Sequence, residues 1–130
     1  MNKLILVIMV NLLFNCTTKP DQNNSSMKTT PKVVEVVLFE AYPGYSKEDV
    51  KTALASLNDI VKLYHGFVER TTASNGDGKY VDIVYWNDMK SAKAAAEDLT
   101  KNQDAAAVFN IIKPESIQMY HFDAFNQFEE

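Results

Sequence analysis

Cysteine and histidine are scarce in this chain. The 130 residues include one cysteine, Cys16, and two histidines, His65 and His121. A single cysteine cannot form a disulfide within the chain. Neither histidine stands beside further ligands at a spacing typical of metal sites. We therefore expect no metal site and no internal disulfide.

Positive charge is also scarce, and it is scattered. The chain has 13 lysine and arginine residues against 17 aspartate and glutamate residues, which gives a formal net charge of −4. Proteins that bind nucleic acids or anionic lipid concentrate basic residues in a patch or run. No such run is present, so we expect no nucleic-acid partner.

The longest apolar run lies at the N-terminus. Lys3 precedes an apolar stretch from Leu4 to Phe14, and Cys16 follows closely. This order is typical of a signal peptide, and the run is shorter than the roughly twenty residues that a membrane-spanning helix needs. The segment Leu13-Phe14-Asn15-Cys16 resembles a bacterial lipobox, in which the cysteine sulfur is lipidated, although Asn15 replaces the usual small residue.

These features predict an exported lipoprotein of the cell envelope, lipid-anchored to a bacterial membrane, with its domain in the periplasm or at the cell surface. Residues 1–15 form the signal peptide, residues 16–30 a polar tether and residues 31–130 the domain. Lipidation of Cys16 leaves no free thiol for catalysis. Two alternatives remain open: an ordinary or uncleaved signal with an incidental cysteine, and translation from Met27, which gives a cytosolic domain.

The domain alternates strand-like and helix-like patterns. Strands are predicted over 33–39, 67–73, 79–86 and 117–125, and helices over about 47–64, 89–99 and 104–109. Ser46 with Asp49, and Asn87 or Asp88, are suited to begin the two long helices, and Gly66 to end the first. The order β-α-β-β-α-β predicts a ferredoxin-like α+β fold, a four-stranded antiparallel sheet with both long helices on one face.

The strands are apolar on both faces. Val34, Val36 and Leu38 alternate with Val33, Val37 and Phe39, so one apolar face remains after the helices cover the other. Monomers seldom expose a large apolar patch, and a second copy can cover it. We therefore predict a homodimer.

Asp82 is an isolated acid in an apolar strand. If the loop 74–78 closes with Ala73 opposite Lys79, antiparallel pairing places Asp82 opposite Arg70. We interpret the two residues as a structural ion pair, with a catalytic acid as the alternative. His65 is suited to cap the end of the first helix.

One series of residues comprises Gly66-Phe67, Asp77-Gly78-Lys79-Tyr80-Val81-Asp82-Ile83-Val84-Tyr85-Trp86, Ala92, Ala95, Ala96, Phe109 and Pro114-Glu115-Ser116-Ile117. This series resembles the dimeric α/β-barrel superfamily, and within it antibiotic biosynthesis monooxygenase-like domains. This resemblance implies two sheets closing a barrel across a dimer interface. It also implies a site for a small hydrophobic molecule between each sheet and its helices.

The resemblance also suggests site residues. It implies a ligand pocket at Trp86, with Tyr85 and Tyr120 as further contacts and His121 and Tyr85 as candidate catalytic residues. Packing alone is the alternative for each of them. The haem-degrading branch carries a histidine on the helix after such a tryptophan, but residues 93–97 contain none, so no cofactor is expected.

Two functions follow. The first is a module that binds a small hydrophobic or aromatic molecule without a complete catalytic set. The alternative is a cofactor-independent monooxygenase-like enzyme acting on an aromatic or quinone-like substrate.

Overall fold

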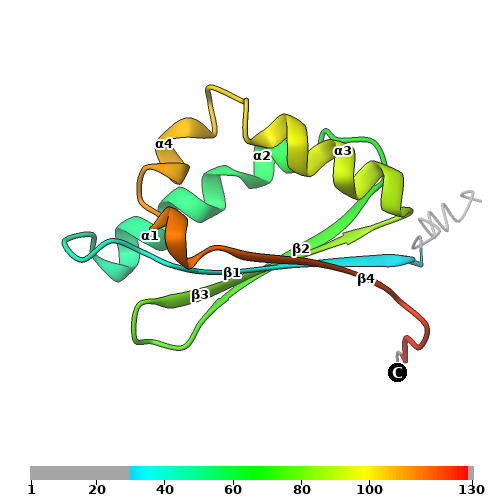
Figure 1. Ribbon diagram of the computed structural model, residues 1–130, viewed down its shortest axis with the longest axis horizontal. Coiled ribbons are helices and arrows are strands. Elements are labelled where there is room, and N and C mark those ends of the chain that lie inside the picture. The colour runs from blue at the N-terminus through cyan, green and yellow to red at the C-terminus, as the bar shows by residue number, and fades with distance from the viewer. Residues whose placement is uncertain (1–29, 129–130) are drawn as a thin grey trace, which may run out of the picture.

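The computed structural model describes residues 30–128, which form an antiparallel sheet covered on one face by helices (Figure 1). The elements follow in the order β1 (Val33–Glu40), α1 (Lys47–Ser56), α2 (Asn58–Val61), β2 (Phe67–Ser74), β3 (Lys79–Trp86), α3 (Met89–Leu99), α4 (Ala106–Phe109), the 3-10 helix η1 (Pro114–Ser116) and β4 (Gln118–Asp123). The predicted signal peptide, Cys16 and nearly all of the predicted tether lie outside the described residues. No helix within residues 30–128 is long and apolar enough to cross a membrane.

The sheet has the strand order β2-β3-β1-β4, and all its pairs are antiparallel. The two central strands, β1 and β3, pair along their whole length, from Val33 opposite Trp86 to Glu40 opposite Lys79. This arrangement confirms the predicted ferredoxin-like α+β fold.

Side-chain alternation along β1 divides the sheet into a covered and an open face. Val33, Glu35 and Phe39 point toward the helices and are buried. Val33 and Phe39 join a core formed by apolar residues of the sheet and all four helices, which includes Val50, Leu54, Leu57, Val61, Tyr80, Val84, Trp86, Ala92, Ala95 and Val108. The core therefore lies entirely between the sheet and its helix layer.

The other face of the sheet is not covered by any described element. Leu38, Tyr120 and Phe122 on this face have 41%, 46% and 54% of their surface exposed. The rings of Tyr120 and Phe122 stack on each other, with centroids 6.0 Å apart. The apolar open face expected from the sequence is present, while the homodimer inferred from it stays a prediction.

Both long helices begin where the sequence indicates. The Ser46 side chain accepts a hydrogen bond from the Asp49 amide, and the Asp49 carboxylate accepts one from the Ser46 amide, which completes a capping box. Asp88 caps α3 by accepting from the Ser91 amide. These caps satisfy amides that have no partner inside a helix.

The first helix does not run unbroken to Tyr64 as expected. It ends at Ser56, and a single turn, α2, follows after Leu57. The Leu54 carbonyl accepts from the Leu57 amide and from Arg70 Nη1 at 2.7 Å. Arg70 of β2 therefore bonds to the last turn of α1, where the helix ends.

The expected pairing of β2 with β3 is wrong by two residues. Ala73 lies opposite Val81 and Asp82 opposite Thr72, whereas we expected Lys79 and Arg70. The Asn75 amide bonds the Lys79 carbonyl at 3.1 Å, and the Asn75 side chain accepts from the Asp77 and Lys79 amides. This side chain closes a tighter turn than the predicted five-residue loop.

Candidate functional site

A cavity of about 150 Å³ lies between the covered face of the sheet and the helices. Its walls are mainly apolar, with Val37 and Val84 from the sheet and Leu57 from the helix layer. Ala95 and Ala96 of α3 also line it, and their small side chains leave space that larger ones would fill. Ile117 and Met119 line the cavity and are also 40% and 43% exposed, so it approaches the surface beside β4.

Trp86 forms part of the cavity wall at the end of β3. It is 1% exposed, and its indole meets the Phe67 ring edge to face, with centroids 6.0 Å apart and an interplanar angle of 83°. Its Nε1 is buried and has no hydrogen-bond partner among residues 30–128. Trp86 is therefore both a packed core residue and a wall of the cavity, with one hydrogen-bond donor unused.

Glu35 brings a carboxyl group to the same cavity. It lies on β1 directly opposite His121 of β4, and His121 Nε2 is 2.6 Å from Glu35 Oε2. Glu35 is only 6% exposed. Burial raises the pKa of the Glu35 carboxyl group, His121 offsets part of this effect, and the nearby Asp82 charge adds to it.

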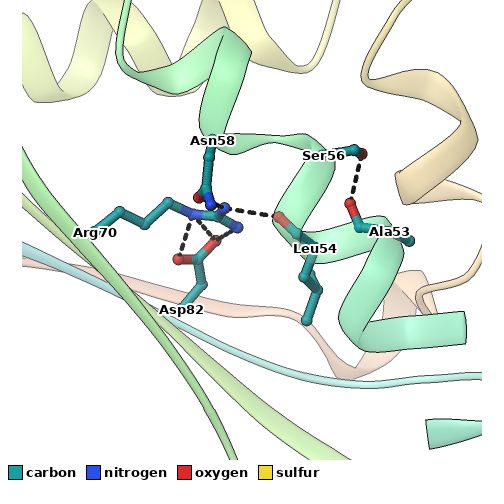
Figure 2. A network of polar contacts seen from close by, with 6 residues as sticks. All are labelled: Ala53, Leu54, Ser56, Asn58, Arg70 and Asp82. Carbon is teal, nitrogen blue, oxygen red and sulfur yellow. Dashed lines mark hydrogen bonds and ion pairs between the residues drawn. The ribbon is translucent and has the colours of Figure 1, made fainter. Parts of the chain in front are cut away.

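Asp82, which also lines the cavity, forms an ion pair with Arg70 (Figure 2). Arg70 Nε and Nη2 lie 2.9 and 2.8 Å from the two Asp82 carboxylate oxygens, and Arg70 Nη1 donates to the Leu54 carbonyl and to Asn58 Oδ1. The side chains of Arg70 and Asp82 are 3% and 14% exposed. The pair thus joins β2, β3 and the α1–α2 break in a buried network.

The ion pair forms although Arg70 and Asp82 are not directly opposite each other, as we had expected them to be. Arg70 lies opposite Val84, two residues along the strand from Asp82's partner Thr72 and on the same face. A long side chain reaches a diagonal neighbour of this kind across about 7–8 Å. Arg70 and Asp82 therefore form their ion pair even though the β2–β3 register differs by two residues from the expected one.

The sequence placed Tyr85 and Tyr120 in a pocket with Trp86, and the structure corrects this. Both tyrosines lie on the open face, because Tyr85 alternates with Trp86 on β3 and Tyr120 pairs with Val36 on β1. Neither lines the cavity. His121 lies on the covered face but reaches the cavity only through Glu35.

Glu35 is the site residue that the sequence analysis missed. Its signal was present, since it is the only charged residue within Val33–Phe39. It also falls in alternation with Val33 and Val37, which predicts that it faces the same layer.

A second polar cluster lies where the loop before β2 meets the start of α3. Ser91 Oγ lies 3.1 Å from His65 Nδ1 and 3.0 Å from Asp88 Oδ2. His65 therefore contacts the start of α3 instead of capping the first helix. In a serine nucleophile triad the histidine stands between serine and acid, whereas here the serine is in the middle. We assign the cluster to the cap of α3.

No group of three or more potential metal ligands occurs within residues 30–128.

Comparison with known proteins supports the fold. Neither a family model nor a curated protein matches the sequence. Among solved structures, the chain is similar to SnoaB, a cofactor-independent oxygenase from Streptomyces nogalater, with 19% identity and a TM-score of 0.62 over 78% of this chain and 100% of that chain. It is also similar to a proposed antibiotic biosynthesis monooxygenase from Bordetella bronchiseptica, with 13% identity and a TM-score of 0.62 over 75% and 100% of the two chains.

A third similar structure is a protein of unknown function from Nitrosomonas europaea, with 16% identity and a TM-score of 0.60 over 77% and 95% of the two chains. These similarities support the resemblance to antibiotic biosynthesis monooxygenase-like domains at the level of the fold. Because one fold hosts many activities, function has to be argued from the cavity itself.

Proposed function

We propose that the domain binds a small aromatic or other compact hydrophobic molecule in the cavity between sheet and helices. The observation that carries this proposal is the cavity of about 150 Å³ with mainly apolar walls and Trp86 at its side. An engineered apolar cavity of about this volume in another protein binds benzene. A single aromatic ring is therefore the largest rigid group that the cavity suits without rearrangement.

The single tryptophan makes this proposal directly testable. Trp86 is the only tryptophan in the chain, so tryptophan fluorescence reports on the cavity wall alone. Titration of the full chain with benzene is expected to change the emission of Trp86 to a plateau. A linear change without a plateau would contradict specific binding.

Two variants of α3 give a matched control. Ala96 lines the cavity, whereas Ala94 is exposed on the same helix. Ala96→Leu places a larger apolar side chain in the cavity and is expected to abolish the saturable change. Ala94→Leu makes the same substitution outside the cavity and should bind benzene as the wild type does. Equal binding by both variants would show that benzene binds elsewhere.

A cofactor-independent monooxygenase-like activity on an aromatic or quinone-like substrate is the second candidate. It is favoured by the Glu35–His121 pair, because a carboxyl group bonded to an imidazole at a cavity can move a proton to or from a bound molecule. Oxygen consumption in the presence of hydroquinone tests it. The rate should exceed that without protein and fall in the Glu35→Gln variant; equal rates in all three samples would leave binding as the function.

A further inference from the structure

We infer that Glu35 determines which molecules the cavity accepts, because its unpaired carboxylate oxygen accepts a hydrogen bond from an amino or hydroxyl group on the bound ring. Anionic ligands are excluded by the same residue. This inference rests on the proposed binding function, since it specifies the ligand of that cavity. His121 acts as a positioning residue that holds the carboxyl group.

The first observation concerns the two oxygens of the Glu35 carboxyl group. Oε2 lies 2.6 Å from His121 Nε2, and no residue among 30–128 donates a hydrogen bond to Oε1. Oε1 is not among the fully buried polar atoms that lack a partner within residues 30–128, so it keeps accessible surface. A carboxylate accepts several hydrogen bonds, so a donor on a bound molecule can bond to this oxygen.

The second observation concerns the charges around the cavity. Among residues 30–128, Glu35 and Asp82 are the only charged residues that line it, and both are acidic. Arg70, the nearest cation to Asp82, is already used by that carboxylate, the Leu54 carbonyl and Asn58. An anionic ligand would therefore meet carboxylates without a free cation, whereas a neutral ring with an N–H or O–H donor meets an acceptor.

The third observation concerns the support of Glu35. His121 is its direct cross-strand partner and is itself partly buried, with 16% of its side chain exposed. The interaction engages Oε2 and so leaves Oε1 for the ligand. Replacing His121 should therefore weaken selectivity for a donor while the apolar walls still bind a bare ring.

Isothermal titration of the full chain with benzene, aniline and benzoate tests the inference. The three probes share one ring, and only aniline carries a neutral hydrogen-bond donor. We expect the wild type to bind aniline more tightly than benzene and not to bind benzoate. Because a hydrogen bond to a charged group is worth more than one to a neutral group, Glu35→Met should weaken aniline binding roughly tenfold to a hundredfold and leave benzene binding unchanged.

Three further variants serve as controls. Glu69→Met makes the same substitution at an exposed position of β2 and should leave all three affinities unchanged. His121→Leu should lower the ratio of aniline to benzene affinity. His121→Gln keeps an N–H donor for Glu35 and should restore that ratio, which a merely structural role of His121 would not predict.

The outcomes separate this inference from the proposed function. If Glu35→Met weakens benzene and aniline binding equally, or weakens neither, or if the wild type binds benzoate, then Glu35 does not select the ligand, although the cavity still binds one. If the wild type binds neither benzene nor aniline, the proposed binding function is wrong and the inference falls with it.

Discussion

Replacing Arg70 with methionine tests the buried network between the sheet and the α1–α2 break. Methionine keeps much of the apolar length of the side chain but removes the guanidinium group. The Asp82 carboxylate, 14% exposed, then loses its cation, while the Leu54 carbonyl and Asn58 lose a donor (Figure 2). The chain must therefore bury a charge without a partner.

The expected cost is large compared with the stability of a small domain. Removing one member of a buried ion pair typically costs about 3–5 kcal/mol, whereas domains of this size have a total unfolding free energy of about 5–15 kcal/mol. We expect Arg70→Met to lower the free energy of unfolding by an amount near the first of these ranges. The side chains of Arg70 and Asp82 are both well buried, so water screens their charges little. Asp82→Leu should also destabilise the folded domain, since it leaves the buried guanidinium group without a counter-ion.

The double variant distinguishes an interaction from two separate effects. Arg70→Met with Asp82→Leu removes both charges and is expected to cost clearly less than the sum of the single variants. The free energy of unfolding can be measured by urea denaturation, with Trp86 fluorescence as the signal. Strict additivity would refute the reasoning, because it would mean that the two charges do not stabilise each other.

An exposed ion pair of similar length provides the control. Lys51 Nζ lies 2.9 Å from Glu48 Oε1, but the two side chains are 61% and 80% exposed. Lys51→Met should leave the midpoint of unfolding nearly unchanged, because exposed pairs contribute little. Burial, and not the distance between the charged atoms, is therefore expected to set the cost.

Four further predictions follow from other parts of the chain. Burial raises the pKa of Glu35, so the folded state holds the carboxyl proton more tightly than the unfolded state does. The wild type should therefore lose stability as the pH rises above the ordinary glutamate pKa. Urea denaturation over this pH range should show Glu35→Gln gaining stability relative to the wild type. A Cβ at Gly66 would lie 2.6 Å from Ser91 Cβ, whereas a Cβ at Gly76 would meet nothing within 4 Å, although the two glycines have nearly the same φ. Gly66→Ala should therefore lower the melting temperature much more than Gly76→Ala does. Equal losses of melting temperature would exclude the clash. We propose that the open face is covered by a second copy, and light scattering coupled to size exclusion of a chain starting near Met27 should give twice the mass of that chain; a stable monomer would contradict this. We also propose that the exported protein is lipidated at Cys16, so labelled palmitate should enter the wild type and not Cys16→Ser, while equal labelling would argue against the lipobox.

Periodicity in the sequence was sufficient to predict the order of the elements. Apolar spacing and capping residues depend on local geometry, so Ser46 and Asp88 mark the helix starts correctly. The pairing of β2 with β3 was not predictable in the same way, since it depends on how the Asn75 side chain closes the turn. The break after Ser56 was missed, and local periodicity could not show that Arg70, from a strand later in the chain, bonds to the helix there.

The site was predictable only in part. Trp86 was singled out by the family resemblance and Asp82 as a lone acid in an apolar strand, and both line the cavity. Tyr85 and Tyr120 were misplaced, although adjacent residues of a strand point to opposite faces and Tyr85 follows this rule against Trp86. The contact between Glu35 and His121 joins residues from opposite ends of the domain, and only the β1–β4 pairing brings them together.

The central position of β1 also determines how the domain would respond to a mechanical load. β1 is bonded to β3 on one side and to β4 on the other, and Lys32 just before it bonds the Trp86 carbonyl and the Ala124 amide. Hydrogen bonds in antiparallel sheets run perpendicular to the strands. A pull on the chain preceding β1, directed along the strand, would therefore load both ladders in shear at once instead of opening them one bond at a time. The sheet would therefore resist tension applied at the start of β1 more strongly than tension that separates the strands one hydrogen bond after another.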